Sequence, residues 1–242
     1  MAMTIDSLIA LDQELLTWFN GSESLFLDNF VVLLTTGITW IPLYVALFVL
    51  VMKNNEAMSQ IMLVVGCAAL CILFADGVAD GLVKPLVGRP RPCNDPLLKY
   101  AVDIAGNYRV SGFSFFSAHA ANTMSIAVFF TLLVRNRTFT AAMLLWSLLN
   151  GWTRLYLGLH YPGDVLCGFL WGAVSGCLAY LLFYKVYLRI SPKLNYISTQ
   201  YTRTGYSKND IDMVIAVMVL TVAMLMILSS LYHAFILIIY PI

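Results

Sequence analysis

The chain has 242 residues, of which 60% are hydrophobic and only 11% are charged, and its mean hydropathy is +0.82. These values exclude an ordinary soluble domain and predict an all-α polytopic membrane protein, formed as one membrane domain over residues 1–242. A net charge of +1 provides no basic excess for nucleic acid, and the five cysteines show neither a disulfide framework nor a metal-ligand spacing.

The first predicted element is a short amphipathic helix over residues 4–20, whose apolar side chains recur at helical spacing opposite acidic ones. Longer apolar runs follow. Because about twenty residues span a bilayer, these runs predict six transmembrane helices, over residues 25–52, 61–83, 120–134, 139–157, 165–188 and 213–240. The first of them is one long helix that Thr35-Thr36-Gly37 and Pro42 are suited to break.

The number of spans predicts which segments share a side of the membrane. Both termini, the segment between the second and third spans and the linker between the fourth and fifth fall on one side, and eight of the fourteen basic residues fall on the other. Of the six on the first side, three belong to the candidate site. The positive-inside rule therefore places that site on the exoplasmic face, which is the periplasmic face of a bacterial inner membrane.

Lys84 and Arg91-Pro92 form the first polar cluster, at the end of the second span. Prolines limit the freedom of the backbone between the two cations. A lysine and an arginine are a common pair for phosphoryl oxygens, but a basic patch that touches lipid headgroups explains this cluster as well. Arg89 rivals Arg91 in the first interpretation.

Ser117, Ala118 and His119 form the second cluster, directly before the third span. A serine there is a natural N-cap, and the first amides of a helix attract anions. His119 would then lie beside a bound phosphate and donate a proton to a departing oxygen. The alternative is a simple cap with a histidine at the headgroups.

Arg154, His160 and Asp164 form the third cluster. Tyr161-Pro162-Gly163 should end one helix and begin the next, with His160 in the turn and Asp164 in a first helical turn. The carboxylate can accept the N–H of one imidazole nitrogen, so that the other nitrogen keeps its lone pair and can act as a nucleophile. An Arg154–Asp164 pair that ties two helix ends around a satisfied histidine remains an alternative.

Together, the spacing and order of the three clusters resemble the type 2 phosphatidic acid phosphatase family, relatives of the vanadium haloperoxidases. The resemblance implies that His160 attacks phosphorus, Asp164 orients it and His119 protonates the leaving group. It also implies that no metal or other cofactor is needed. The phosphate-binding residues that it implies are Lys84, Arg91, Ser117, Ala118 and Arg154.

The chain departs from the family pattern at three positions. Phe116 and Ala118 replace a proline and a glycine, and Thr153 replaces a serine. We expect activity to survive, because no functional side chain is lost. Asp80 lies one helical turn before Lys84, which favours an ion pair between them.

The resemblance implies a phosphatase in the lipid bilayer that hydrolyses a lipid phosphate or diphosphate through a phosphohistidine. Undecaprenyl diphosphate is the favoured substrate, because the loop from Cys93 to Ser114 is short and mostly apolar. Phosphatidylglycerophosphate, phosphatidic acid and lipid A 1-phosphate are alternatives. A lipid phosphotransferase of the same chemistry and a non-catalytic lipid-binding protein are competing functions, and nothing in the sequence predicts the oligomeric state.

Overall fold

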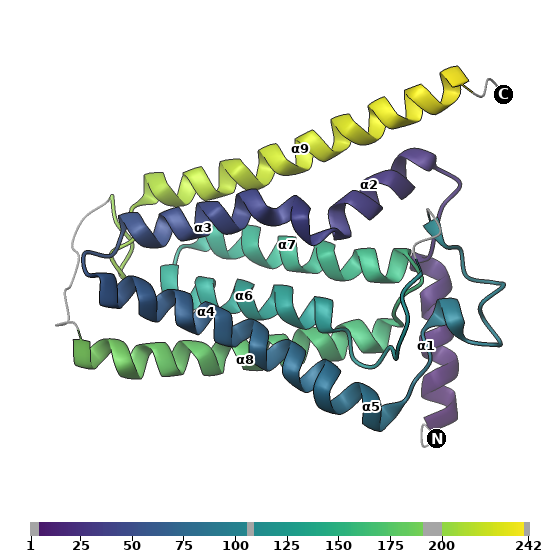
Figure 1. Cartoon of the computed structure of the whole chain (residues 1–242), viewed down its shortest axis with the longest axis horizontal. Helices are drawn as coiled ribbons and strands as arrows, with labels where there is room; N and C mark the ends of the chain where they lie inside the picture. The colour runs from purple at the N-terminus through teal and green to yellow at the C-terminus, as the bar shows by residue number, and fades with distance from the viewer. Residues whose placement is uncertain (1–4, 106–108, 191–199, 240–242) are drawn as a thin grey trace.

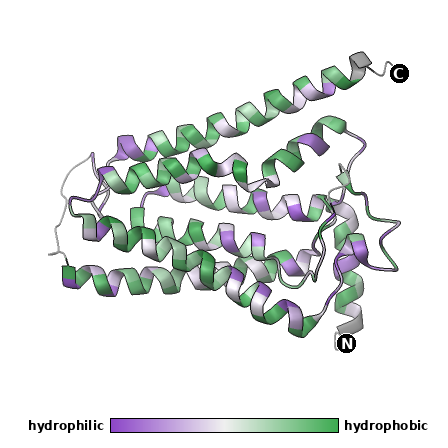
Figure 2. Cartoon of the chain, in the orientation of Figure 1, coloured by the Kyte–Doolittle hydropathy of each residue, from purple (hydrophilic) through white to green (hydrophobic). Residues whose placement is uncertain are grey.

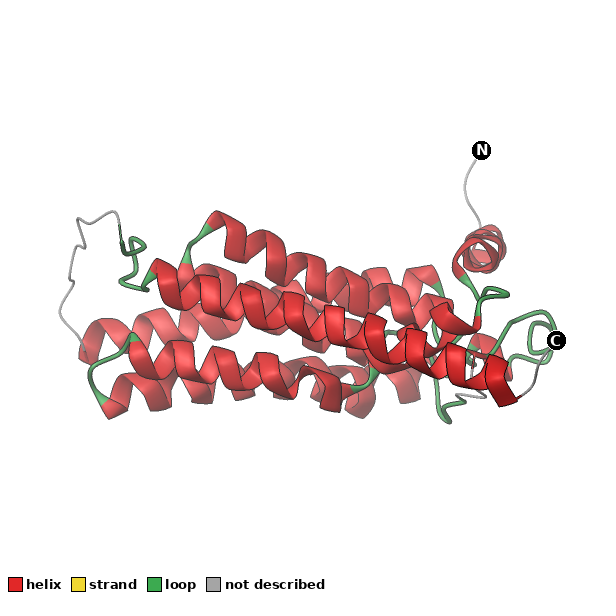
Figure 3. Cartoon of the chain, turned by 90° about the horizontal axis from the view of Figure 1, so that it is seen from above, coloured by secondary structure: helices red, strands yellow, loops and turns green. Residues whose placement is uncertain are grey.

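The computed structural model describes residues 5–105, 109–190 and 200–239, which form helices and loops with no β-strand, as predicted (Figure 3). The predicted ends of the first helix at Thr4 and of the last at Tyr240 lie outside these residues. The elements are α1 (Ile5–Phe19), α2 (Leu25–Thr35), η1 (Gly37–Trp40), α3 (Ile41–Lys53), α4 (Met58–Val78), η2 (Ala79–Val83), α5 (Lys84–Val87), η3 (Pro92–Asn94), α6 (Ala118–Val134), α7 (Arg137–Tyr156), α8 (Pro162–Ile190) and α9 (Lys208–Ile239).

The first apolar run is broken where its polar residues predict a break. Helices α2 and α3 meet at an angle of 67° around η1. Side chains take up the carbonyls that the break releases, since Thr36 Oγ1 donates to Val32 O at 2.7 Å and Trp40 Nε1 donates to Leu34 O at 2.9 Å. These bonds satisfy two of the backbone carbonyls that the break leaves without a helical partner, as a chain in lipid requires.

The second apolar run is a continuous helix of 30 residues, Met58–Val87, formed by α4, η2 and α5. It extends past the predicted end at Val83, and Lys84 therefore lies in its last turn. The turn Ala79–Val83 is a π-helix, which changes the hydrogen-bond register just before Pro85, a residue without an N–H. Gly88 ends the helix in the left-handed conformation, with φ of 63°.

The helices differ in how far they meet the requirements of a membrane span. Within the described residues, three helices are long and apolar enough, namely Met58–Val87, α8 and α9, and the bent pair α2–α3 is a fourth if it counts as one span. Helix α6 has only 17 residues, of which 12 are buried by its neighbours, and α7 buries Ser147, Asn150 and Thr153. Helix α6 runs inside the bundle (Figure 1), whereas α7 also exposes apolar side chains, with Leu145 at 57% and Leu148 at 49%. Figure 2 shows apolar residues along the lengths of the long outer helices.

Helices α6 and α8 pack with their backbones in close approach. An added Cβ at any of three α8 glycines would lie 2.3–2.5 Å from a carbonyl oxygen of α6, at the pairs Gly168–Ser117, Gly172–Ala121 and Gly176–Ser125. Small residues at every fourth position are typical of close helix packing in membranes. This packing brings the N-termini of α6 and α8 together, and with them the second and third polar clusters.

Helix α1 lies across the end of the bundle near which both chain ends are found (Figure 1). Leu16 is buried against the bundle, packed with Leu155, Tyr161 and Val165. Several other apolar side chains of α1 are exposed, among them Leu8 at 48% and Trp18 at 77%. The predicted amphipathic helix is therefore present, with apolar side chains on two sides.

Candidate active site

The three predicted clusters meet at the end of the bundle that α1 crosses. Backbone hydrogen bonds join the segments that carry them: Ser117 N donates to Asp164 O at 3.0 Å, and Cys93 N donates to Gly158 O at 3.1 Å. The first bond ties α6 to α8, and the second ties the segment after Arg91 to the turn before His160. The polar site is thus held by main chain as well as by side chains.

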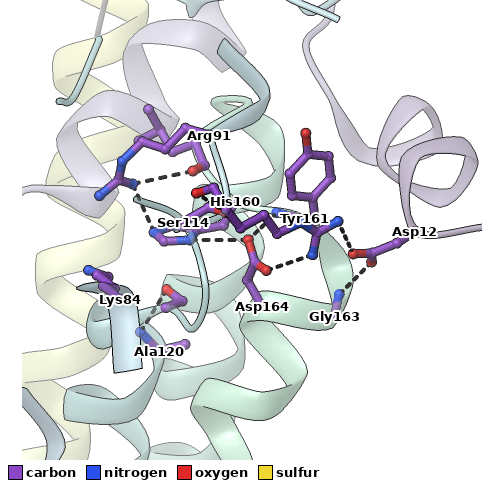
Figure 4. Close-up of polar contacts among 12 residues, drawn as sticks. Asp12, Lys84, Arg91, Ser114, Ala120, His160, Tyr161, Gly163 and Asp164 are labelled. Atoms are coloured by element: carbon purple, nitrogen blue, oxygen red, sulfur yellow. Dashed lines mark hydrogen bonds and ion pairs between the residues drawn. The ribbon is translucent and has the colours of Figure 1, made fainter. Parts of the chain in front are cut away.

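His160 lies in the turn between α7 and α8 and is only 2% exposed. Its Nε2 is 3.0 Å from Arg91 Nη1 (Figure 4). A guanidinium has no acceptor, so Nε2 accepts this bond and the imidazole proton lies on Nδ1. Nδ1 faces Asp164 Oδ2 at 3.6 Å, too far for a hydrogen bond, and has no other partner among the described residues.

The surroundings of His160 keep its imidazole neutral. Burial lowers the pKa of His160 to about 4, and the positive charges of Arg154 and Arg91 act in the same direction, against the opposing carboxylate of Asp164. At neutral pH the ring therefore keeps a lone pair on Nε2. A neutral imidazole with its proton directed at a carboxylate is the form that a nucleophile requires.

Asp164 is fully buried in the first turn of α8. Its Oδ1 accepts from Arg89 Nη1 at 2.9 Å, and its Oδ2 accepts from Tyr161 N at 3.0 Å. Arg89 and Arg91 therefore contact different groups of the site: Arg91 contacts the imidazole of His160, and Arg89 contacts the carboxylate of Asp164. The alternative of an Arg154–Asp164 pair is not what the structure shows, since the arginine on Asp164 is Arg89.

The two arginines predicted to bind phosphate are both buried, with exposed fractions of 5% for Arg91 and 7% for Arg154. Arg91 also donates to the carbonyls of Ser111 at 3.2 Å and Leu159 at 3.3 Å. Arg154 Nη1 donates to Thr35 Oγ1 at 2.8 Å, and its carbonyl accepts from His160 N at 3.3 Å. Arg154 thus supports the turn that carries His160.

His119 lies in the first turn of α6, directly after Ala118. Its Nε2 is buried and has no hydrogen-bond partner among the described residues. Arg154 and His160 both lie near enough to act on it electrostatically. A buried ring nitrogen without a protein partner is unusual, and its position close to His160 leaves it within the candidate site.

The remaining predicted residues lie at the edge of this group. Ser117 is the N-cap of α6, with its Oγ accepting from Ala120 N at 3.4 Å, and Ala118 is the first helical residue. Lys84 pairs with Asp80 at 2.5 Å, as the spacing predicts. Figure 4 draws Lys84 without a hydrogen bond or ion pair to Arg91, His160 or Asp164.

Sequence reasoning missed two supporting side chains, Asp12 and Thr35. Asp12 of α1 forms an ion pair with Arg89 at 2.7 Å, and Thr35 at the end of α2 accepts from Arg154. Both contacts join residues far apart in the chain, and no local pattern marks them. Among the described residues, no three side chains of the types His, Cys, Asp and Glu are grouped as metal ligands.

Comparison with known proteins points to one family. The model of the PAP2 superfamily matches residues 62–188. A lipid A 4′-phosphatase of Bacteroides thetaiotaomicron is 38% identical over 188 residues, which cover 77% of this chain and 83% of that protein. A lipid A 4′-phosphatase of Porphyromonas gingivalis is 29% identical, with 76% of each chain covered. The crystal structure of Aquifex aeolicus LpxE has a TM-score of 0.54 and 26% identity, and covers 70% of this chain and 94% of that one.

Proposed function

Since the chain belongs to the PAP2 superfamily and is an integral membrane lipid phosphatase of that family, we propose that it removes a phosphate group from lipid A. The observation that carries this substrate is the 38% identity to a lipid A 4′-phosphatase over 83% of that protein's length. Residues 84–164, which hold every proposed site residue, lie inside the matched family region.

In the proposed reaction, Nε2 of His160 attacks the phosphorus atom, and the bond between phosphorus and the lipid oxygen breaks as the phosphohistidine forms. His119 donates a proton to the departing lipid oxygen. Water then attacks the phosphohistidine, His119 takes its proton, and inorganic phosphate leaves. The neutral imidazole of His160 supports its role as the nucleophile. The Nε2 of His119 has no hydrogen-bond partner among the described residues, which leaves it available to the departing oxygen.

The carboxylate of Asp164 faces the Nδ1–H of His160 and stabilises the positive ring of the phosphohistidine. Arg91, now 3.0 Å from Nε2, occupies the place where phosphate oxygens must come, so its guanidinium moves from the imidazole to the phosphate when substrate binds. Fixed cations then carry the charge of the transferred group, and no metal is assigned a role. The remaining groups that we assign to the phosphate are Lys84, Arg154, Ser117 and the first amides of α6 at Ala118.

We place the whole chain in the inner membrane as one domain with six spans, counting the bent α2–α3 pair, α6 and α7 among them. The site then faces the periplasm. The excess of basic residues predicted on the other side of the membrane supports this orientation, and the site lies at the end of the bundle near which both chain ends are found (Figure 1). The exposed apolar side chains of α1, including Trp18, support a helix that lies in the membrane surface.

Undecaprenyl diphosphate remains a second candidate substrate. The loop after Arg91 exposes large apolar side chains, with Leu97 at 84% and Tyr100 at 89% exposed. Such an edge suits a polyprenyl chain better than a sugar. Transfer of the phosphoryl group to a second lipid is the competing reaction, and labelled donor phosphate recovered in a lipid product would identify it.

Purified protein in detergent should be offered lipid A, undecaprenyl diphosphate, phosphatidylglycerophosphate and phosphatidic acid, with phosphate release measured for each. Mass spectrometry of the lipid A product would show whether the 4′ or the 1 position is cleaved. The proposal expects the highest kcat/KM on lipid A and none in a His160→Ala variant. A preference of tenfold or more for another lipid would overturn the substrate, and normal turnover by His160→Ala would overturn the nucleophile.

A further inference from the structure

Asp12 lies on α1, outside the three motifs, yet it contacts Arg89, the residue that pairs with the Asp164 carboxylate. Its Oδ2 pairs with Arg89 Nη2 at 2.7 Å, and Arg89 Nη1 reaches Asp164 Oδ1 at 2.9 Å. One guanidinium therefore joins two carboxylates, one on the surface helix and one behind His160. Figure 4 labels the two carboxylates, Asp12 and Asp164, and draws dashed lines to each of them.

Asp12 also contacts α8 directly. Its Oδ1 accepts a hydrogen bond from Gly163 N at 2.6 Å, in the helical turn that carries Asp164. A carboxylate at this point satisfies an amide that the helix itself leaves unpaired. The glycine makes room for it, because an added Cβ at Gly163 would lie 3.1–3.3 Å from the Asp12 carboxylate.

The plane of the Arg89 guanidinium is fixed from three sides. Asp12 and Asp164 hold its two ends, and its face lies over the ring of Tyr161, 3.7 Å from the ring centre. With Asp12 neutral, one end loses its charged partner and Arg89 can rotate away from Asp164. The Asp164 carboxylate is then held less firmly on the side that faces Arg89, and its distance of 3.6 Å from His160 Nδ1 can change.

We propose that Asp12 is a positioning residue of this phosphatase, which acts through Arg89 to hold Asp164 against His160. The inference rests on the proposed function of His160 and Asp164. It makes the seating of the surface helix α1 part of the catalytic geometry. Because small misplacements of reacting groups reduce rates by up to about a hundredfold, the effect belongs in kcat and not in substrate binding.

The substitution Asp12→Asn removes the charge and keeps the bond from Gly163 N, because the amide oxygen of Asn can still accept it. The NH₂ group then takes the place of Oδ2 and faces Arg89 Nη2, donor to donor. The docking of α1 has other supports, namely buried Leu16 and the bond from Asn20 Nδ2 to Tyr156 O at 2.8 Å. We expect kcat for phosphate release to fall roughly tenfold, within a factor of about three, with KM changed less than about twofold. Asp12→Glu should restore part of the loss, and Glu14→Gln, an exposed acid on the same helix, should change neither constant.

The role of Arg89 is tested by combining variants. In an Arg89→Met background, Asp12→Asn should cost less than about a further twofold, because the residue through which Asp12 acts is gone. A full tenfold loss in both backgrounds would overturn the proposed route. An unchanged kcat in Asp12→Asn alone would overturn the role of Asp12.

A second readout needs no substrate. The chain has three histidines, so the ¹⁵N signals of His160 can be assigned by His119→Gln and His233→Gln variants in lipid nanodiscs. Asp12→Asn should shift the Nδ1 signal of His160, and Glu14→Gln should not; equal spectra for wild type and Asp12→Asn would overturn the inference. If wild-type protein releases no phosphate from any lipid, the proposed function fails, and the spectra still decide the role of Asp12.

Discussion

Replacing Asp164 by asparagine should remove most of the activity while the fold survives. The carboxylate accepts two hydrogen bonds, from Arg89 Nη1 at 2.9 Å and from Tyr161 N at 3.0 Å, and faces the Nδ1 proton of His160. An asparagine side chain has one acceptor oxygen, so it cannot serve both donors. Its NH₂ group must face either Arg89 or the pair formed by Tyr161 N and His160 Nδ1.

Both orientations are costly because Asp164 is fully buried. One donor is left facing another donor, at about 1–3 kcal/mol, and Arg89 loses one of its two charged partners, so we expect the free energy of unfolding to fall by roughly 2–4 kcal/mol. If the NH₂ group faces His160, it favours the tautomer with the proton on Nε2, which has no lone pair for phosphorus. Losing the carboxylate should lower kcat by about 10²–10⁴-fold.

The assay is phosphate release under saturating substrate, with unfolding of each variant followed by heat in the same detergent. Asp212→Asn is the matched control, because Asp212 is exposed near the start of α9, at the other end of the bundle. It should leave both quantities unchanged. A folded Asp164→Asn protein with kcat within threefold of wild type would refute the pairing of Asp164 with the nucleophile.

Three further predictions concern pH, packing and topology. Because the pKa of His160 is lowered to about 4 and only the neutral ring attacks, kcat/KM should not decline from nucleophile protonation between pH 7 and 5; a limb near pH 6.5 assigned to His160 would contradict its burial. Gly172→Ala should lower the free energy of unfolding by about 1–3 kcal/mol, since its Cβ would meet Ala121 O at 2.3 Å, whereas Gly66→Ala, with nothing within 4 Å, should not. Tyr100→Cys, in a chain without other cysteines, should react with an impermeant maleimide applied outside intact cells, and labelling from the cytoplasmic side alone would invert the topology.

The sequence predicted the helices well because each is a long apolar run between polar turns. It also named two places suited to a break, and the helix breaks at the first, Thr35-Thr36-Gly37, whereas Pro42 lies in the first turn of α3. It could not show that α6 is enclosed by other helices. The apolar composition of α6 fits contact with protein as well as contact with lipid, and only its packing against the neighbouring helices shows that it faces protein. The end of the second helix was also misplaced, because a π-turn carries it past Pro85.

Within the site, local spacing was enough where the partners lie within one turn of each other. His160 with Asp164 and Lys84 with Asp80 are both four residues apart, and both pairs face each other in the structure. The choice between Arg89 and Arg91 could not be made, because it depends on where Asp12 and the α7–α8 turn lie. Those positions are set by contacts between segments more than sixty residues apart.

The glycines of α8 then have a consequence for catalysis. His119 lies in the first turn of α6 and His160 lies just before α8, so the distance between the proposed acid and the proposed nucleophile depends on how closely these two helices approach. The approach is set by Gly168, where an added Cβ would lie 2.5 Å from Ser117 O, and by the bond from Ser117 N to Asp164 O. Widening this contact by even a methyl group moves both imidazoles relative to the phosphate. We therefore expect the three α8 glycines that approach α6 to influence the proposed reaction through the distance between the two helices.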